Sequence, residues 1–379
     1  MNASLNEKLG TVKWGEFKYK EVFNRIEQGR RLKKDDQIDG TIPFVMSGTT
    51  NAGVVNYISN PVASFPKNAI TIDIFGNTFY RNYAFGAGDD TGVYWNDATA
   101  YSSNAMLFFA VAMQKSMMGR FSYGKKLRSS QSEDFTMHLP VTDDGAIDFD
   151  FMESFIAELE AERVAELSAY LTVSGLDNYE LSKQELKALA ELKNVTWGKY
   201  KMGDLFEKVK TKKLPYKAKE LPTEATGKYT LPCLTSSFKN QGLNYFAPVQ
   251  GATVLKSVIT IPQNSDVYRA YYQSSDFTVL SDAYAIDWKF DKRTLSREQY
   301  LFMVMCINKV TDLPIYSYKN KLGGWNVVKD KYILLPQVNG EIDFNYMEDF
   351  ISAMQKLAIK DVVSFTDRKI AGTKEVIAK

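Results

Sequence analysis

The sequence predicts a mixed α/β protein, of α+β type, made of two tandem copies of one domain that is each time followed by a long helix. Three observations support this. A series of landmark residues returns once along the chain, each copy contains short apolar and aromatic runs broken by Gly, Pro, Asn and Ser, and each copy closes on a capped, amphipathic helix. A repeat constrains the architecture before single elements are assigned, and broken apolar runs are typical of strands joined by loops. At 379 residues the chain can bury two cores.

The landmarks of the repeat keep their order. Each copy opens with a Trp-Gly pair, at Trp14 and at Trp197, and closes with the pattern Gly-x-Ile-Asp-Phe-x-x-Met-Glu-x-Phe-Ile. The matched segments are 12–15 with 195–198, 42–43 with 231–232, 56–57 with 244–245, 70–72 with 259–261, 80–81 with 268–269, 122–127 with 317–322, 139–140 with 335–336, and 145–156 with 340–351.

Each copy ends in a helix whose start the sequence marks. Asp150 and Asn345 stand three residues before Glu153 and Glu348, which is the spacing of a capping box. A helix usually packs its apolar face on its own domain, but two matching stripes in one chain favour mutual packing into an antiparallel coiled-coil-like pair. The residues expected to pair are Met152, Phe155, Ile156, Leu159 and Leu167 with Met347, Phe350, Ile351, Met354 and Leu357.

These signals divide the chain into four parts. They are a first domain (1–146), a central helical region (147–194), a second domain (195–341) and a C-terminal helical region (342–379). The central region carries an additional capped segment at 182–185, which predicts a short helix leading to the second domain.

Composition sets limits on function. The formal net charge is only +2, but basic residues gather between Lys199 and Lys219 and again between Arg120 and Arg128, on either side of an acidic helix. No long apolar segment or leader pattern is present, so we expect a soluble, cytoplasmic protein. The two cysteines lie in apolar runs without metal-ligand spacing, and we expect reduced thiols and no metal.

The sequence predicts no catalytic centre. His138 is the only histidine and lies in an apolar run, so schemes that pair Ser, Cys or a metal with His lack their second member. The glycine-rich stretch 86–92 has neither the strand before it nor the helix after it that a nucleotide site needs. Adjacent aspartates such as Asp89 and Asp90 lie in turn-forming sequence and are typical of exposed turns.

Taken together, the repeated domain-plus-helix unit, the Trp-Gly opening and the Ile-Asp-Phe close resemble the specificity (S) subunits of type I and related type IIB restriction-modification systems. The resemblance covers nearly the whole chain. It implies two target-recognition domains that each read one half of a bipartite DNA sequence, and paired helices that set their separation and dock methyltransferase subunits.

What the resemblance implies for chemistry is a non-catalytic subunit. Double-stranded DNA and methyltransferase subunits would be its partners, with a restriction subunit where one joins, and no membrane is involved. The complex would methylate adenine and, with a nuclease, cleave DNA. This chain would bind no cofactor, and S-adenosylmethionine would lie on the partner. The sequence itself contains neither the Asn/Asp-Pro-Pro-Tyr/Phe tetrapeptide of such methyltransferases nor a glycine-rich cofactor motif.

DNA contacts need donors for phosphates and base edges, and Arg, Lys, Asn and hydroxyl side chains supply them. The residues predicted to contact DNA lie in loops of both copies. In the first copy they are Thr49, Thr50, Asn51, Arg81, Lys125, Lys126 and Arg128; in the second they are Lys210, Lys212, Lys213, Ser237, Lys239, Asn240, Arg269, Lys319 and Lys321.

A second hypothesis is a non-catalytic scaffold whose two domains bind peptide or glycan. The aromatic content of 13% suits such surfaces as well as it suits a core. Salt dependence separates the two hypotheses, because binding that neutralises several phosphates weakens steeply as salt is added.

Overall fold

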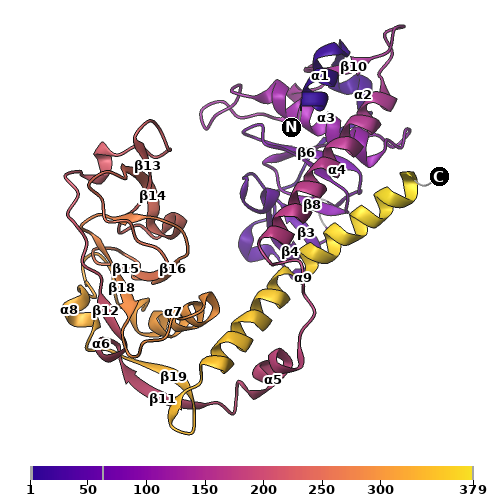
Figure 1. Ribbon diagram of the computed structural model, residues 1–379. Coiled ribbons are helices and arrows are strands. Elements are labelled where there is room, and N and C mark those ends of the chain that lie inside the picture. Colours follow the sequence, from indigo (N-terminus) through magenta and orange to yellow (C-terminus); the bar gives the residue numbers. More distant parts are fainter. Residues whose placement is uncertain (1–2, 62–63, 378–379) are drawn as a thin grey trace. The chain divides into compact units, whose positions relative to one another are not determined.

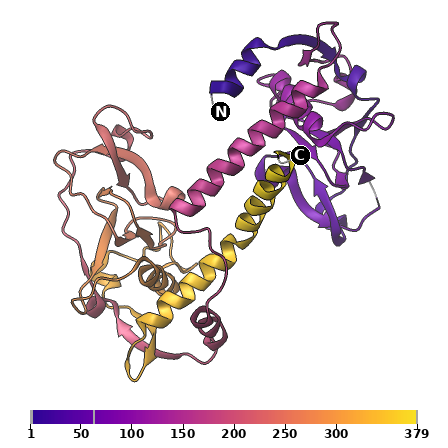
Figure 2. The same ribbon diagram turned by 45° about the vertical axis from the view of Figure 1, so that its right-hand side comes forward.

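The computed structural model describes residues 3–61 and 64–377, and it divides into two compact units. Residues 1–170 and 366–379 form the first unit, and residues 171–365 form the second. Figures 1 and 2 show the elements of each unit. Among the described residues, no helix combines the length and the apolar character needed to cross a bilayer.

The first unit contains two four-stranded sheets and a two-stranded ribbon. One sheet has the order β2-β9-β6-β7, the other β4-β3-β8-β5, and β1 pairs antiparallel with β10. The elements are α1 (Ala3–Thr11), β1 (Lys13–Lys18), α2 (Tyr19–Val22), β2 (Arg25–Gln28), β3 (Asp39–Val45), β4 (Val54–Ile58), β5 (Ser64–Phe65), β6 (Ala69–Asp73), β7 (Thr78–Arg81), β8 (Phe85–Ala87), β9 (Thr91–Trp95), α3 (Ser103–Met117), β10 (Thr136–Val141) and α4 (Phe149–Val173), with short 3-10 turns at Lys34–Asp36, Thr50–Gly53 and Ser129–Gln131.

The second unit repeats this plan. Its sheets have the orders β12-β18-β15-β16, β14-β13-β17 and β11-β19-β20. The elements are α5 (Lys183–Glu191), β11 (Thr196–Lys201), α6 (Met202–Leu205), β12 (Phe206–Lys208), β13 (Tyr229–Leu234), β14 (Leu243–Pro248), β15 (Val258–Pro262), β16 (Tyr271–Gln273), β17 (Thr278–Val279), β18 (Ala283–Trp288), α7 (Arg297–Thr311), α8 (Trp325–Val328), β19 (Tyr332–Val338), β20 (Glu341–Ile342) and α9 (Phe344–Ile377), with 3-10 turns at Ala218–Glu220 and Lys239–Gly242. The predicted fold class, two α/β domains each followed by a long helix, is confirmed.

The strand register corrects one landmark of the repeat. Tyr80 in β7 lies opposite Ile70, and Tyr272 in β16 lies opposite Ile259, the matching isoleucine of the second copy. The structural equivalent of Arg81 is therefore Gln273. The sequence match of Tyr80-Arg81 with Tyr268-Arg269 is wrong, because the second copy has a longer turn between the two strands.

The additional capped segment is part of the repeat. It forms α5, which precedes β11 as α1 precedes β1. Lys8 of α1 pairs with Glu158 of α4, and Glu185 of α5 accepts hydrogen bonds from Ser352 (2.5 Å) and Lys356 (3.0 Å) of α9. In both units a short helix is therefore tied to the long helix of its own repeat. Helix α1 was not predicted from the sequence, whereas α5 was.

The long helices begin as parts of their own domains. Met152 and Phe155 of α4 are buried in the core of the first unit, where the Phe155 ring lies edge-on to Phe108 at 6.1 Å. Phe350 of α9 packs in the same way on Phe302 at 5.9 Å. These residues of α4 and α9 are therefore not available for helix pairing, because Phe108 of α3 and Phe302 of α7 already pack against them. The same holds for Met347 and Ile351, which are buried in the second core, and for Ile156 and Leu159, which pack against the first.

The later part of each stripe differs. Leu167 is half-buried, whereas Met354 and Leu357 are exposed. Within the first unit, the last part of α9 lies beside α4, where Lys369 Nζ approaches Glu160 Oε1 to 2.6 Å. Buried Thr366 and Val164 belong to the same two stretches. An ion pair between the two long helices is thus seen at residues other than those predicted to pair.

We expect Lys356→Met to destabilise the second unit by about 2–3 kcal/mol, because it leaves Glu185 as an uncompensated buried charge. Burial raises the pKa of Glu185, but hydrogen bonds from Ser352 and the Ser182 backbone and the Lys356 ammonium together hold it below its ordinary value. A lowered carboxylate pKa contributes stability above the unfolded value that is lost as the pH falls.

The control is Lys8→Met, which removes the equivalent but exposed pair of the first unit and should cost under about 1 kcal/mol. Urea unfolding at neutral and acid pH measures both variants. Equal losses, or a Lys356 effect that does not shrink in acid, would contradict this assignment.

Candidate nucleic-acid interface

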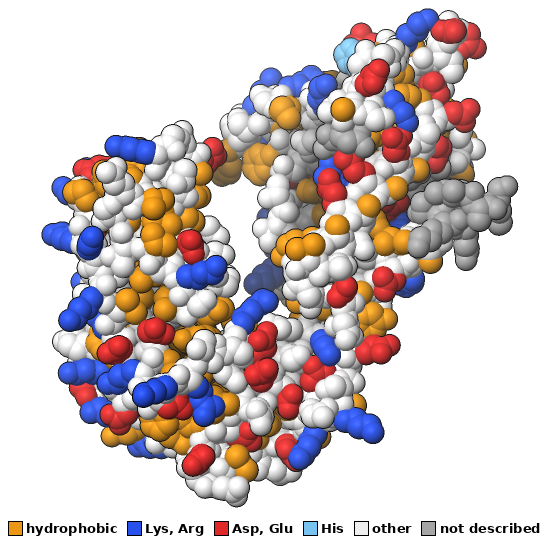
Figure 3. Space-filling view, viewed as in Figure 1, with side chains coloured by type: hydrophobic (Ala, Val, Ile, Leu, Met, Phe, Trp, Pro, Cys, Tyr) orange, Lys and Arg blue, Asp and Glu red, His pale blue; other side chains and the backbone are white. Residues whose placement is uncertain are grey.

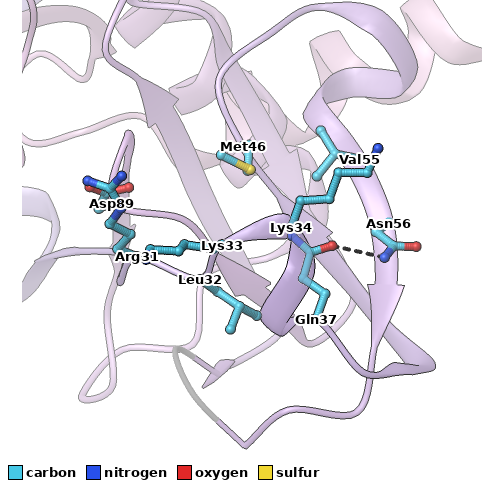
Figure 4. Close-up of a pocket in the computed structure, with 9 residues that line it drawn as sticks. All are labelled: Arg31, Leu32, Lys33, Lys34, Gln37, Met46, Val55, Asn56 and Asp89. Carbon is cyan, nitrogen blue, oxygen red and sulfur yellow. Dashed lines mark hydrogen bonds between the residues drawn. The ribbon is translucent and has the colours of Figure 1, made fainter.

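A groove of about 820 Å³ crosses the surface of the first unit beside the β3–β4 hairpin. Its walls are the loop after β2 and strand β4, and Asn56 Nδ2 donates to Gln37 Oε1 across 2.9 Å to join them. Figure 4 shows Arg31, Lys33 and Asp89 on one side, with Lys34 and Val55 on the other. The lining residues are Arg31, Leu32, Lys33, Lys34, Gln37, Met46, Val55, Asn56 and Asp89.

The loop that lines this groove is fixed at its start. Gly29 donates to the carbonyl of Thr91 and Arg30 to that of Ala87, both at 2.9 Å. A Cβ at Gly29 would lie 2.2 Å from the carbonyl oxygen of Gly88, so a glycine is required here. The basic side chains that follow are exposed to solvent. The arrangement presents several cations from one anchored loop, which is suited to a polyanion.

The second unit has a basic loop at the equivalent place, directly after β12. Val209 donates to Ala285, and Lys212 donates through its backbone to Thr253 Oγ1 at 2.9 Å. Lys210, Lys212 and Lys213, which were predicted to contact DNA, are exposed. Figure 3 shows further Lys and Arg side chains spread over the surface of this unit.

Sequence reasoning named the lysines of the second loop but missed those of the first. The run Arg30-Arg31-Leu32-Lys33-Lys34 was a visible signal. Its equivalence to the lysines after β12 emerges only from the strand order, since each loop follows the edge strand of the corresponding four-stranded sheet, β2 in the first unit and β12 in the second.

The hairpin beside each basic loop turns through a rare backbone conformation. Asn51, Ala52 and Gly53 have φ of 48°, 50° and 82°, and Asn240, Gln241 and Gly242 have 46°, 53° and 87°. Left-handed residues are uncommon outside glycine and asparagine, and three in succession are strained. Each asparagine side chain caps the turn, Asn51 by donating to Val54 O and Asn240 by donating to Leu243 O. The two turns are built alike.

Arg81 holds the first turn in place and is not a surface residue. Its side chain is 1% exposed and donates to Ala52 O (2.5 Å), Thr71 Oγ1 (3.1 Å) and Tyr83 Oη (3.1 Å). Burial lowers its pKa. The prediction that Arg81 contacts DNA is therefore wrong, because β7 directs this side chain beneath the turn.

Gln273 does the same in the second unit. Its amide donates to Gln241 O (3.2 Å) and to Thr260 Oγ1 (3.1 Å), the equivalents of Ala52 and Thr71. Asp73 adds support in the first unit, where its buried carboxylate accepts from Gly48 N (3.0 Å) and Ser47 Oγ (3.2 Å). Both turns are thus anchored from below and offer their outer side chains to solvent.

The outer side chains differ between the two turns. Thr49, Thr50 and Asn51 are exposed in the first, as are Lys239 and Asn240 in the second. Ser237 is half-buried and its hydroxyl accepts from the Lys239 backbone at 3.1 Å, which gives it a structural role within the turn.

The remaining predicted residues fall into three groups. Arg269 is bound to Asp312 at 2.7 Å, and this hydrogen bond and charge raise its pKa, so it is engaged within the protein. Arg128 donates to the carbonyl of Asp89 at 2.6 Å and so lies at the rim of the groove. The others occupy exposed loops after α3 and α7, and they are Lys125, Lys126, Lys319 and Lys321.

Other chemistry has little support. The described residues contain no group of three His, Cys, Asp or Glu side chains able to hold a metal. His138 lies in β10, exposed and opposite Glu16. Burial raises the pKa of both Cys233 and Cys306 to about 12, which is unsuited to a nucleophilic thiolate.

Comparison with known proteins agrees with the resemblance to specificity subunits of restriction-modification systems that the sequence shows. Residues 11–169 match the family model described as "Type I restriction modification DNA specificity domain". A curated relative, the "Type II restriction enzyme BgcI specificity subunit S.BcgI" of Heyndrickxia coagulans, is 28% identical over 155 residues, which are 40% of this chain and 45% of that protein. The match spans less than half of the relative.

Solved structures extend the likeness in fold to the whole chain. The S subunit of a type I restriction-modification system from M. genitalium superposes with a TM-score of 0.54 and 13% identity, over 97% of this chain and 94% of that one. The likeness covers both units, including the second, which lies outside the family-model match.

Proposed function

We propose that this chain, whose residues 11–169 match the family model described as "Type I restriction modification DNA specificity domain", is the sequence-specific DNA-binding subunit of a restriction-modification complex. It reads a bipartite DNA target, one half with each unit. Partner subunits then methylate adenine and, where a nuclease subunit joins, cleave the DNA.

The observation that carries this proposal is the repeated pairing of a basic loop with an anchored turn. Each unit has exposed cations directly after the edge strand of one sheet, next to a rigid turn on the other sheet. Cations supply phosphate contacts that give affinity without sequence information. A preorganised turn supplies side chains for the base edges, at low entropic cost.

Different outer residues on equal scaffolds suit the reading of two different half-sites. Asn51 and Asn240 carry the amide that pairs with adenine, and Lys239 can reach guanine. We propose these, with Thr49 and Thr50, as base-reading candidates. The phosphate contacts are assigned to exposed cations of the loops, which are Arg30, Arg31, Lys33, Lys34, Lys125, Lys126 and Arg128 in the first unit and Lys210, Lys212, Lys213, Lys319 and Lys321 in the second.

The chain is proposed to be non-catalytic and to bind no cofactor. S-adenosylmethionine would be held by a methyltransferase subunit, and this chain would contribute only DNA recognition and docking. The support is the sequence, which has one histidine and lacks phosphate-loop and methyltransferase motifs.

The direct test is co-expression with a methyltransferase subunit of such a system, followed by mapping of methylated adenines. We expect one motif made of two short blocks separated by unread base pairs, and no methylation by either subunit alone. Affinity for the motif should fall by about 10³-fold or more between 50 and 200 mM salt if six or more phosphates are contacted.

Two results would refute this proposal. One is methylation or cleavage by the pure chain. The other is binding that salt leaves unchanged, which would favour a peptide or glycan ligand instead.

A further inference from the structure

Each unit carries a small exposed hairpin after its domain helix, which is α3 in the first unit and α7 in the second. In the first, Ser122 and Lys125 exchange backbone hydrogen bonds of 3.1 and 3.0 Å; in the second, Ser317 N donates to Asn320 O at 3.0 Å. The tyrosine after each serine projects into solvent, with Tyr123 83% and Tyr318 60% exposed. The leucine that closes each hairpin, Leu127 or Leu322, is buried in the domain core.

A lysine lies over each of these rings. Lys126 Nζ is 4.7 Å from the centre of the Tyr123 ring, and Lys321 Nζ is 4.7 Å from that of Tyr318. A cation over an aromatic ring at this distance is attracted to its face. The same serine, tyrosine, lysine and leucine therefore recur with the same lysine-to-ring distance, although the neighbouring residues differ.

We propose that these two tyrosine-lysine hairpins, residues 122–127 and 317–322, are matching clamps for the DNA backbone that act whatever the base sequence. This inference rests on the proposed function. The lysine ammonium and the tyrosine hydroxyl are both donors to phosphate oxygens, and the ring offers an apolar face to the sugar.

The repetition itself argues for backbone contact. Two units that read different half-sites share only the phosphate and sugar of their targets. A side-chain pair that is identical in both units fits that shared feature, whereas the outer residues of the anchored turns differ between the units.

Charge and position favour DNA over a protein partner. Residues 119–128 contain four cations and no carboxylate, and residues 315–322 contain two cations and no carboxylate. The first hairpin also adjoins the basic groove, because Arg128 binds the carbonyl of Asp89 in its wall. The second is fixed to its own domain by Tyr318 N, which donates to Asp266 Oδ1 at 2.9 Å.

The test uses the full complex with the methyltransferase subunit and a duplex that carries the mapped motif. Lys126→Gln, Lys321→Gln and the double variant are compared with Lys187→Gln, which neutralises an exposed lysine on α5. Each clamp variant should reduce the slope of log affinity against log salt by about 0.9, and the double variant by about twice that. Tyr123→Ala should weaken binding about 3- to 10-fold, and the methylated motif should remain unchanged.

Three outcomes would overturn the inference. They are an unchanged salt slope, a motif altered at particular bases, and loss of the methyltransferase subunit during purification, which would make the hairpins a docking surface for that protein. If the wild-type complex fails to bind DNA at all, the proposed function fails together with the clamp. If the wild-type complex binds the motif with a steep salt dependence and the variants show the same slope of log affinity against log salt, only the clamp inference fails and the proposed function stands.

Discussion

Replacing Arg81 with alanine should abolish recognition of one half-site and leave the other intact. The change removes three hydrogen bonds, leaves the Ala52 carbonyl without its buried donor and opens a cavity under β7. Without that anchor, the left-handed residues Asn51 and Ala52 can relax. We expect a loss of about 2–4 kcal/mol in the unfolding free energy of the first unit, and binding weakened about 10- to 100-fold.

The second unit supplies the matched control. Arg81→Gln introduces the residue type that anchors the turn of the second unit. There, Gln273 donates to the turn carbonyl of Gln241 and to Thr260 Oγ1 on the strand. The glutamine variant should therefore retain more recognition than alanine. Binding is measured on duplexes with one half-site scrambled at a time. If alanine weakened binding equally to both kinds of duplex, Arg81 would act on general stability and not on one turn.

The fold was predictable because the sequence contains two copies of the same landmark residues. The Trp-Gly openings, the capped helix starts and the closing Ile-Asp-Phe segments are local patterns, and local patterns survive in sequence. Helix α1 was not predicted, whereas its counterpart in the second copy, α5, begins with the capping box that the sequence indicates.

The candidate site was predictable only in part. Charge runs and loop asparagines are visible in sequence, and those of the second unit were found. The role of Arg81 was not, because whether an arginine after a tyrosine points into solvent or beneath a turn depends on strand register. Arg81 and Gln273 are structurally equivalent, but one is charged and the other neutral, so a comparison of the two copies by sequence does not pair them.

The first part of the stripe of each long helix was assigned to the wrong partner for a similar reason. A helical periodicity shows that one face is buried but not what buries it. Phe108 and Phe302 on the domain helices cover the first turns of α4 and α9. The turns that remain for other contacts lie beyond Leu159 in α4 and beyond Ala353 in α9.

The length of those later turns should set the number of unread base pairs in the target. Residues of α4 up to Tyr170 belong to the first unit and Leu171 to the second, while α9 belongs to the second unit up to Phe365 and to the first from Thr366. Four extra residues in each helix, placed between Leu167 and Leu171 and between Val363 and Thr366, add about 6 Å of helix, or roughly two base pairs at 3.4 Å. We expect both half-sites unchanged and a spacer about two base pairs longer.

Inserting into one helix alone is the informative control. The buried residues Leu171 and Thr366 each sit in the unit opposite to the start of their own helix. Lengthening only α4 would give a spacer whose two helices differ by about 6 Å. The single insertion should therefore bind its target more weakly than the paired one, whichever spacer it prefers. Methylated-adenine mapping reads out the spacer, and an original spacer in the paired variant would show that the helices do not determine it.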